Sequence, residues 1–169
     1  RDVMMSLVAR DISGLANLEE VVTVMSDLAE IAIDRTVSVY AKELAKRFGV
    51  PRSETGVPQD LIVIGMGKLG GRELNVSSDI DLIFFYDCDG ECGPTPEYPT
   101  VRKIISNQEF YERLAKKVIP ALSEITWEGF VFRVDMRLRP NGESGMLVSS
   151  VDSFEKYQKN EDGTGAWLW

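Results

Sequence analysis

The stretch "NVSSDIDLIFFYD", residues 75–87, places two acidic residues at the start of the most apolar run in the chain. The β-branched and aromatic residues that follow are typical of a buried strand. Side chains alternate along a strand, so Asp79 and Asp81 are expected to point to the same side. Carboxylates held this close repel each other unless a proton or a cation lies between them. A helix capped by Ser77, Ser78 or Asp79 is the alternative, and the apolar run that follows disfavours it.

Magnesium suits such an acid pair. It prefers hard oxygen ligands and commonly uses one or two carboxylates together with substrate phosphates. A third acid lies in "GFVFRVDMRLRP", residues 129–140, which alternates strictly and predicts another strand. The apolar side is expected to carry Phe130, Phe132, Val134, Met136 and Leu138, and the charged side Arg133, Asp135, Arg137 and Arg139.

Asp135 has two interpretations at this stage. Taken alone, an acid among arginines on one strand face is explained by a plain ladder of ion pairs. Together with Asp79 and Asp81, it predicts a site where two metal ions clamp a phosphoryl group during an in-line displacement. The neighbouring arginines would then meet phosphate oxygens, for which their forked donors are suited.

The glycine-rich segment "GMGKLG", residues 65–70, follows an apolar strand predicted over 61–65 and matches the dinucleotide fingerprint. The spacing opposes that interpretation. Only nine residues, 71–79, separate Gly70 from the next strand at Ile80. A parallel crossover needs roughly 10–12 residues or more, including a helix. We therefore expect two antiparallel strands joined by a short segment.

A P-loop is also disfavoured, because Leu69 follows Lys68 where the motif requires Ser or Thr. The simplest interpretation of the segment is a tight turn that needs glycine dihedral angles. The alternative is a turn whose backbone amides contact a phosphate, since a glycine-rich loop lets a ligand approach the main chain.

Hydrophobic periodicity and breaker residues predict the remaining elements. Two long helical segments bracket the glycine-rich region, and loops rich in proline and glycine separate the strands. The expected helices are 3–13, 18–48, 107–125 and 152–158, the expected linker and loop are 51–60 and 87–100, and a further strand is expected at 145–150. This order indicates an α+β fold.

Composition narrows the classes of function. The chain has 169 residues, 44% of them hydrophobic, and 19 basic against 27 acidic residues give a net charge of −8. That charge opposes general nucleic-acid binding, and the apolar runs are too short to span a bilayer. The absence of histidine removes histidine-based triads and metal sites. Cys88 and Cys92 are interpreted as reduced loop thiols of a cytoplasmic protein, and a first residue of Arg1 suggests a piece of something longer.

These motifs carry a specific resemblance. A Gly-Gly turn at Gly70 and Gly71, then Asp79-x-Asp81, then a later single Asp resembles the nucleotidyltransferase β superfamily. More narrowly, "GMGKLGGRELNVSSDIDLIF" (65–84) and "FRVDMRLRPNGESGMLVSS" (132–150) are similar to the glutamine synthetase adenylyltransferase family. The resemblance implies a small mixed or antiparallel sheet with flanking helices. It further implies a helical lead-in over 1–50 and a C-terminally truncated nucleotidyltransferase domain over 51–169.

The same resemblance implies an activity. Members of this family carry two such domains, one attaching AMP to a tyrosine of glutamine synthetase and one removing it by phosphorolysis, with phosphate consumed and ADP released. The segments "LEEVVTVMSDLAEIAID" and "FRVDMRLRP" resemble the AMP-removing domain, whereas "GMLVSS" and "YQKNE" resemble the AMP-attaching one. The first likeness extends further, so AMP removal is favoured. ATP-dependent attachment and a non-catalytic binding module are the alternatives.

The implied partners are glutamine synthetase and a signal protein that reports nitrogen status, in the cytoplasm, without nucleic acid or membrane. The implied cofactor is one or two Mg²⁺ ions, with ATP, ADP or AMP-tyrosine plus phosphate as substrates. By motif position, Asp79, Asp81 and Asp135 bind metal and carry catalysis, Gly70, Gly71 and Ser78 line the phosphate pocket, and Lys68, Arg137 and Arg139 are candidate phosphate contacts. Residues 161–169 depart from the family pattern.

Overall fold

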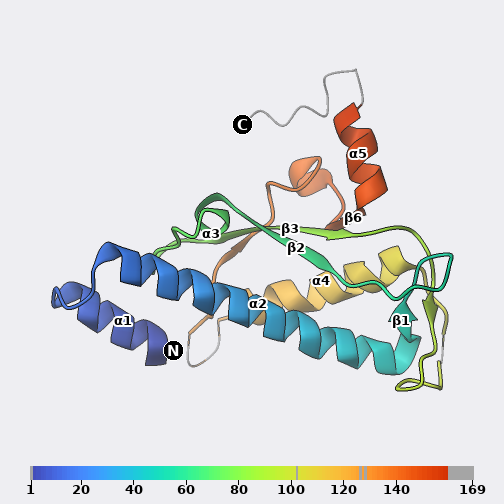
Figure 1. Ribbon diagram of the computed structural model, residues 1–169, viewed down its shortest axis with the longest axis horizontal. Coiled ribbons are helices and arrows are strands. Elements are labelled where there is room, and N and C mark those ends of the chain that lie inside the picture. The colour runs from blue at the N-terminus through green and yellow to red at the C-terminus, as the bar shows by residue number, and fades with distance from the viewer. Residues whose placement is uncertain (1, 102, 126, 128, 160–169) are drawn as a thin grey trace.

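The computed structural model describes residues 2–101, 103–125, 127 and 129–159 (Figure 1). The chain is a mixed α/β structure, as predicted. Its helices are α1 (Asp2–Ile12), α2 (Leu18–Phe48), α3 (Gly67–Gly70), α4 (Asn107–Ser123) and α5 (Val151–Lys159), with a 3-10 turn at Gly142–Ser144. Its strands are β1 (Val50–Pro51), β2 (Ile62–Met66), β3 (Ile80–Tyr86), β4 (Cys92–Gly93), β5 (Val134–Asp135) and β6 (Val148–Ser150).

The central sheet is built around β3. Strand β2 pairs antiparallel with β3 along its whole length, from Ile62 opposite Phe85 to Met66 opposite Asp81, which confirms the predicted antiparallel pair. Strands β5 and β6 both pair parallel with β3. Strand β5 lies beside the start of β3, and β6 beside its end. The sheet is therefore mixed, and the start of β3 is held between β2 and β5.

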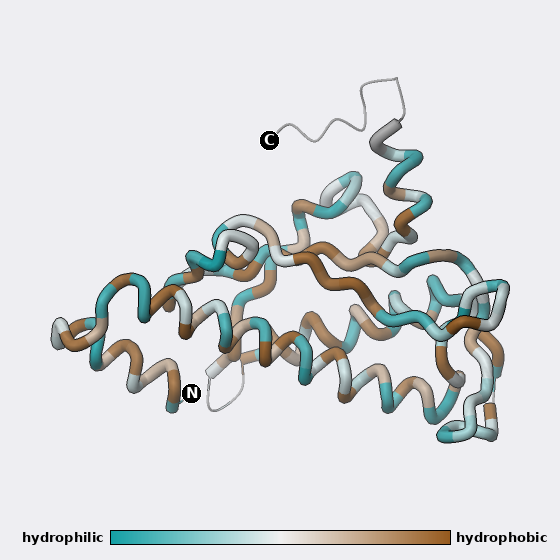
Figure 2. Tube along the Cα trace, viewed as in Figure 1, coloured by the Kyte–Doolittle hydropathy of each residue, from teal (hydrophilic) through white to brown (hydrophobic). Residues whose placement is uncertain are grey.

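Alternate side chains of β3 enter two different environments. Ile80, Leu82, Phe84 and Tyr86 belong to the core cluster formed with α2 and α4, which cover one side of the sheet in Figure 1. Phe85 faces the other way and packs on Phe154 of α5, with ring centroids 4.8 Å apart. In Figure 2 the apolar colour covers much of β2 and β3. Asp81, with the same parity as Phe85, lies on the face away from the main core.

Helix α2 has the bounds that the sequence predicts. The side chain of Asn17 accepts a hydrogen bond from the Glu20 amide (2.8 Å) and caps the first turn. At the other end Gly49 adopts φ 81°, and a Cβ there would lie 2.2 Å from the Gly93 carbonyl oxygen. Only glycine combines that backbone angle with so close an approach of β4. The end of α2 thus sets where β1 begins.

The strand predicted over 129–140 is wrong in extent, because only Val134 and Asp135 pair with β3. Phe132 and Met136 are buried as the alternation predicts, but Phe130 and Leu138 are 47% and 38% exposed. The chain turns away after β5 and returns as β6. The predicted linker and loop also contain a small ladder, β1 with β4.

Asn107 joins three parts of the chain that are distant in sequence. It is fully buried, at 0% exposure. Its Nδ2 donates to the carbonyl oxygens of Arg52 (2.9 Å) and Cys88 (3.1 Å), and its Oδ1 accepts from the Arg52 amide (3.3 Å). The side chain therefore ties β1 and the loop after β3 to the first turn of α4.

We expect Asn107→Ala to lower the free energy of unfolding by about 3 kcal/mol, since it leaves buried backbone groups without partners. Urea denaturation measures this loss. The matched control is Ser106→Ala, which removes only the helix cap to the Glu109 amide and should cost about 1 kcal/mol. Equal losses for the two variants would contradict the tertiary role of Asn107.

Candidate functional site

The start of β3 brings two of the predicted acids together. In the parallel ladder, Asp81 lies directly opposite Asp135 of β5. On the other side of β3, Asp81 lies opposite Met66, the last residue of β2. The glycine-rich segment thus begins beside Asp81. Two strands and a turn that are distant in sequence meet at this carboxylate.

Two arginines hold the outer acids of this group. Arg133 Nε donates to Asp79 Oδ1 (2.5 Å), and Arg133 Nη2 donates to the Ser77 carbonyl oxygen (2.8 Å). Arg137 Nε lies 3.0 and 2.8 Å from the two oxygens of Asp135, and the Arg137 amide donates to Asp135 Oδ1 (2.8 Å). Asp79 and Asp135 each have a guanidinium as counter-ion.

Asp81 differs from both neighbours. Among the described residues, no side chain donates a hydrogen bond to it. Partial burial, followed by the charges of Asp135 and then Asp79, raises the pKa of Asp81 above its usual value, and Arg137 only partly opposes this. The pKa of Asp135 is instead lowered, chiefly by its hydrogen bonds from Arg137. Of the three carboxylates, Asp81 is therefore the one without an ion pair to a described residue.

The glycine-rich segment packs closely against Asp81. Gly67 adopts φ +54°, and a Cβ at this position would lie 2.8 Å from Asp81 Oδ2. A Cβ at Gly70 would lie 2.6 Å from the Gly65 carbonyl oxygen. The segment forms the short helix α3, and the Gly71 amide donates to the Gly67 carbonyl oxygen (3.0 Å). Glycine is therefore required here for a tight turn and for contact with the acid.

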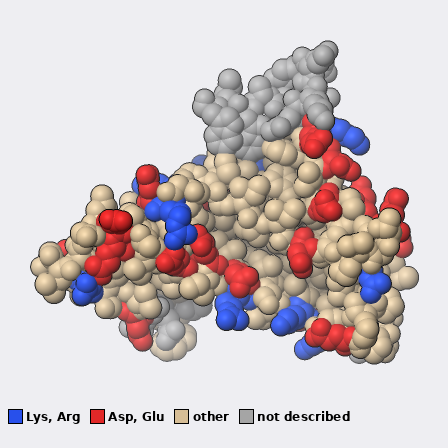
Figure 3. Space-filling view, in the orientation of Figure 1, with Lys and Arg blue, Asp and Glu red and all other residues tan. Residues whose placement is uncertain are grey.

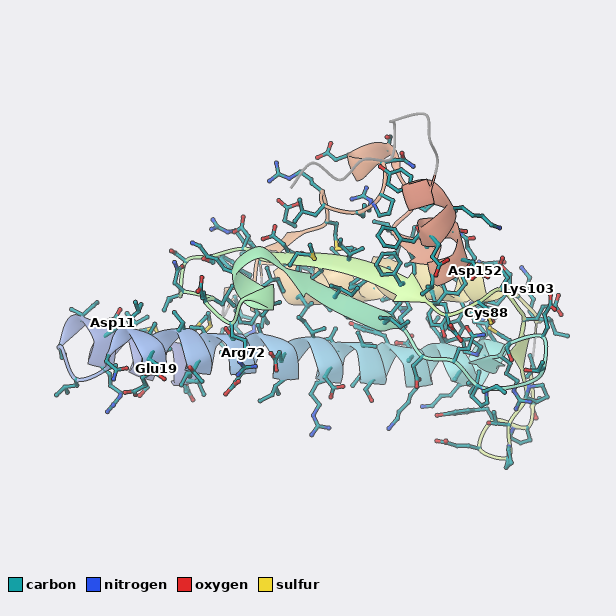
Figure 4. All side chains as sticks on the ribbon, turned by 45° about the horizontal axis from the view of Figure 1, so that its top comes forward. Asp11, Glu19, Arg72, Cys88, Lys103 and Asp152 are labelled. Atoms are coloured by element: carbon teal, nitrogen blue, oxygen red, sulfur yellow. The ribbon has the colours of Figure 1, made fainter. Side chains whose placement is uncertain are left out.

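Arg72 anchors this turn to α2. Its Nη1 donates to Glu30 (2.7 Å), and its Nη2 pairs with Asp27. Figure 4 shows the labelled Arg72 side chain beside α2. From within the segment, Lys68 Nζ donates to Ser78 Oγ (3.3 Å), so these two predicted phosphate-site residues lie together.

Arg139 and Arg133 make contacts that the sequence did not indicate. The three guanidinium nitrogens of Arg139 donate to the carbonyl oxygens of Met136 (2.7 Å), Glu143 (3.0 Å) and Gly145 (3.3 Å). Arg139 thus holds the turn between β5 and β6 together. Sequence reasoning placed Arg133 on the charged face but not among the site residues, although it lies two positions before Asp135, on the same side.

An open depression lies beside the acids. Most of its charged lining has been described above, and Glu143 adds a further carboxylate. The lining residues are Asp79, Arg133, Val134, Asp135, Met136, Arg137, Arg139 and Glu143. Its volume of about 690 Å³ lies within the range typical of sites for small molecules. Cationic and anionic groups are thus both available at its wall.

The donor set fits magnesium by its chemistry, because all three acids offer hard carboxylate oxygens. Among the described residues, however, no three acidic or cysteine side chains lie close enough together to hold a metal as they stand. Asp79 and Asp135 are turned toward their arginines. Coordination by all three acids therefore requires the outer two to leave those arginines.

One face of the molecule shows charges of both signs. On the face shown in Figure 3, acidic and basic side chains of the described residues are interspersed, and the basic ones form no continuous patch. Within the described part of the chain, every helix is too short or too polar to cross a membrane. Cys88 and Cys92 are free thiols.

Comparison with known proteins gives a consistent result. A family model described as glutamate-ammonia ligase adenylyltransferase matches residues 1–169. A protein from Aromatoleum aromaticum, named bifunctional glutamine synthetase adenylyltransferase/adenylyl-removing enzyme, is 52% identical over 169 residues and is matched by 98% of the chain. Proteins of the same name from Bordetella pertussis and Nitrosomonas europaea are 48% and 46% identical, also across 98% of the chain. The chain spans 17–18% of the length of these three relatives.

Proposed function

Because the chain belongs to the glutamate-ammonia ligase adenylyltransferase family, we propose that its acid group catalyses nucleotidyl transfer on glutamine synthetase. The observation that carries this proposal is the pairing of Asp81 with Asp135 on adjacent strands, with Asp79 beside them. Two carboxylates on adjacent strands and a third directly before β3, next to an open depression lined by arginines, suit a metal-bound phosphate.

Asp79, Asp81 and Asp135 would hold one or two Mg²⁺ ions. The metal would neutralise phosphate charge in the transition state and fix the phosphates in line. Asp135, beside the depression, would help to orient the attacking oxygen. Lys68 and Ser78, which already contact each other (3.3 Å), would bind phosphate oxygens from the glycine-rich side. Catalysis would rest on positioning and charge neutralisation rather than on a covalent intermediate.

The other site residues have smaller proposed roles. Gly70 and Gly71 would shape the phosphate pocket through the tight turn. Arg137 would contact phosphate from the depression. Arg139 would act indirectly, because its guanidinium nitrogens already bind carbonyl oxygens of the turn after β5. The proposed boundary between helical lead-in and catalytic domain remains at residues 50 and 51.

The proposed reaction is removal of AMP from the adenylylated tyrosine of glutamine synthetase by phosphorolysis. The likeness of residues 18–34 and 132–140 to the AMP-removing domain supports this direction. The relatives' shared name includes both an adenylyltransferase and an adenylyl-removing activity, so ATP-dependent attachment is the alternative. The proposed cytoplasmic setting and the nitrogen-status signal protein rest on the same family likeness.

The direction is tested with Asp79→Asn in the full-length enzyme. If this domain removes AMP, phosphate-dependent release of ADP from adenylylated glutamine synthetase should fall by at least about a hundredfold. ATP-dependent attachment of AMP should stay within about twofold of the original rate, since it would be catalysed by the other domain. Radiolabelled AMP on glutamine synthetase measures both reactions.

Asp11→Asn is the control, because it removes a carboxylate from α1, far along the chain from the acid group (Figure 4). It should change neither rate. Loss of attachment with intact removal would assign this domain to the opposite reaction. Full retention of both rates would favour the non-catalytic binding module.

A further inference from the structure

Arg133 and Arg137 bind the same carboxylates that a metal ion would need. We propose that they act as internal counter-ions of the acid group. They hold Asp79 and Asp135 until a divalent cation takes over these carboxylates, and the released guanidiniums then contact substrate phosphates. This inference rests on the proposed function and adds Arg133 to the residues of the site.

The geometry of the pairs supports an exchange. The contact of Arg133 Nε with Asp79 Oδ1 at 2.5 Å and the paired contacts of Arg137 Nε with Asp135 occupy oxygens that would otherwise face a cation. Both guanidiniums also line the open depression. A short rotation of each side chain therefore moves it from carboxylate to ligand without crossing the core.

The exposure of the arginine side chains lowers the free-energy cost of this exchange. The side chains of Arg133 and Arg137 are 60% and 70% exposed. The Asp79 side chain is 45% exposed, so the Arg133–Asp79 pair is of the exposed kind that changes an equilibrium constant by about fivefold at most. Asp135 is only 15% exposed, so its pair with Arg137 is not of that kind. A doubly charged cation shared by several carboxylates outcompetes them, because it meets more than one negative charge at once. These pairs orient the two outer carboxylates, and the exposed Arg133–Asp79 pair is weak enough to yield to a cation.

Asp81 determines the order in which metal binding and arginine displacement occur. It has no cationic partner among the described residues, whereas its two neighbours do. A metal ion therefore meets Asp81 first and displaces the arginines second. Arg139 does not take part, because its guanidinium nitrogens donate to three backbone carbonyl oxygens.

This exchange makes a prediction that a purely structural role does not. Removing either arginine frees a carboxylate, so metal should bind more tightly. Removing it also deletes a phosphate contact, so nucleotide should bind more weakly. The two affinities should move in opposite directions, whereas local unfolding would weaken both.

The test uses Arg133→Gln and Arg137→Gln in the 169-residue chain. Electron paramagnetic resonance of free Mn²⁺ measures metal affinity, and calorimetry with ADP at saturating Mn²⁺ measures nucleotide affinity. We expect Arg133→Gln to lower the Kd for Mn²⁺ by about three- to fivefold, and Arg137→Gln by at least as much, because Asp135 is the less exposed carboxylate. Each variant should raise the Kd for ADP by about tenfold or more, the value of a charge-assisted hydrogen bond. Circular dichroism confirms that each variant is folded.

Arg113→Gln is the matched control, because it also breaks an exposed pair, with Glu109 at 2.6 Å on α4. It should change neither Kd. Arg133→Lys keeps the charge, so its Kd for Mn²⁺ should stay near that of the unaltered chain. Unchanged or weaker Mn²⁺ binding in both glutamine variants, with normal binding in the unaltered chain, would overturn this inference alone. Absence of Mn²⁺ binding in the unaltered chain would overturn the proposed function and the inference with it.

Discussion

Replacing Asp81 by asparagine is expected to abolish nucleotidyl transfer while making the metal-free protein more stable. Activity should fall by at least about a thousandfold, because the variant loses the carboxylate that lies beside the other two and that has no ion-pair partner among the described residues. Transfer of labelled AMP to or from glutamine synthetase measures the activity. Thermal unfolding in the presence of a chelator measures the stability.

The stability gain follows from the sign of the pKa shift. Burial and the nearby acids raise the pKa of Asp81 above its ordinary value of 3.8. The folded state therefore holds this proton more tightly than the unfolded state does. Ionised Asp81 therefore destabilises the folded state. This destabilisation is complete at pH values above the folded-state pKa and is absent at pH values below 3.8. The advantage of Asp81→Asn should be present at neutral pH and should vanish as the pH falls toward 3.8.

Asp11→Asn again serves as the control, with neither activity nor midpoint changed. Residues placed for function commonly lower the stability of the fold. A loss of activity together with a gain in stability would therefore identify Asp81 as a functional residue. A variant that is active, or that is less stable than the original at neutral pH, would contradict this account of Asp81.

Gly67→Ala is expected to have the second-largest effect. An alanine Cβ would lie 2.8 Å from Asp81 Oδ2, which is too close, so the carboxylate must move. A misplacement of about 1 Å at a catalytic group costs up to about a hundredfold in rate. The backbone at φ +54° adds a loss of about 1 kcal/mol in the free energy of unfolding.

The matched control is Gly56→Ala. Gly56 also has a positive φ, +83°, but a Cβ there meets nothing within 4 Å. It should show the same loss of about 1 kcal/mol in urea denaturation, with full activity. If both variants lose activity equally, or if Gly67→Ala stays fully active, the contact between Gly67 and Asp81 has no functional role.

Local patterns predicted much of this fold. The buried strand that follows the two acids and the bounds of α2 are each set by residues close in sequence, and the structure has them where they were expected. The short connection after α3 also predicted the antiparallel pairing of β2 with β3. These features depend on periodicity and loop length, which a single sequence displays directly.

Other features depend on contacts between distant segments. The alternating run around Asp135 forms only a two-residue strand, because the chain turns away where Arg139 binds the carbonyl oxygens that follow. The role of Asn107 as a clamp on Arg52 and Cys88 has no local signature. The extent of strand pairing and buried polar contacts of this kind depend on the tertiary structure as a whole.

The candidate site shows the same division. Sequence spacing placed Asp79 and Asp81 at the start of one strand and Asp135 on a second strand, and the structure sets Asp81 beside Asp135. The sequence spacing did not indicate that Arg133 would bind Asp79. Long, flexible side chains select their partners from whatever the fold brings near, so that contact emerges only in three dimensions.

The central claim is that a divalent cation binds among Asp79, Asp81 and Asp135. Paramagnetic broadening of backbone amide signals by Mn²⁺, recorded on the isotopically labelled chain, tests it most directly. We predict that signals of residues 66–68, 79–82 and 134–136 broaden first and that Asp81→Asn removes this effect. Broadening that begins elsewhere, or that persists unchanged in Asp81→Asn, would contradict the claim.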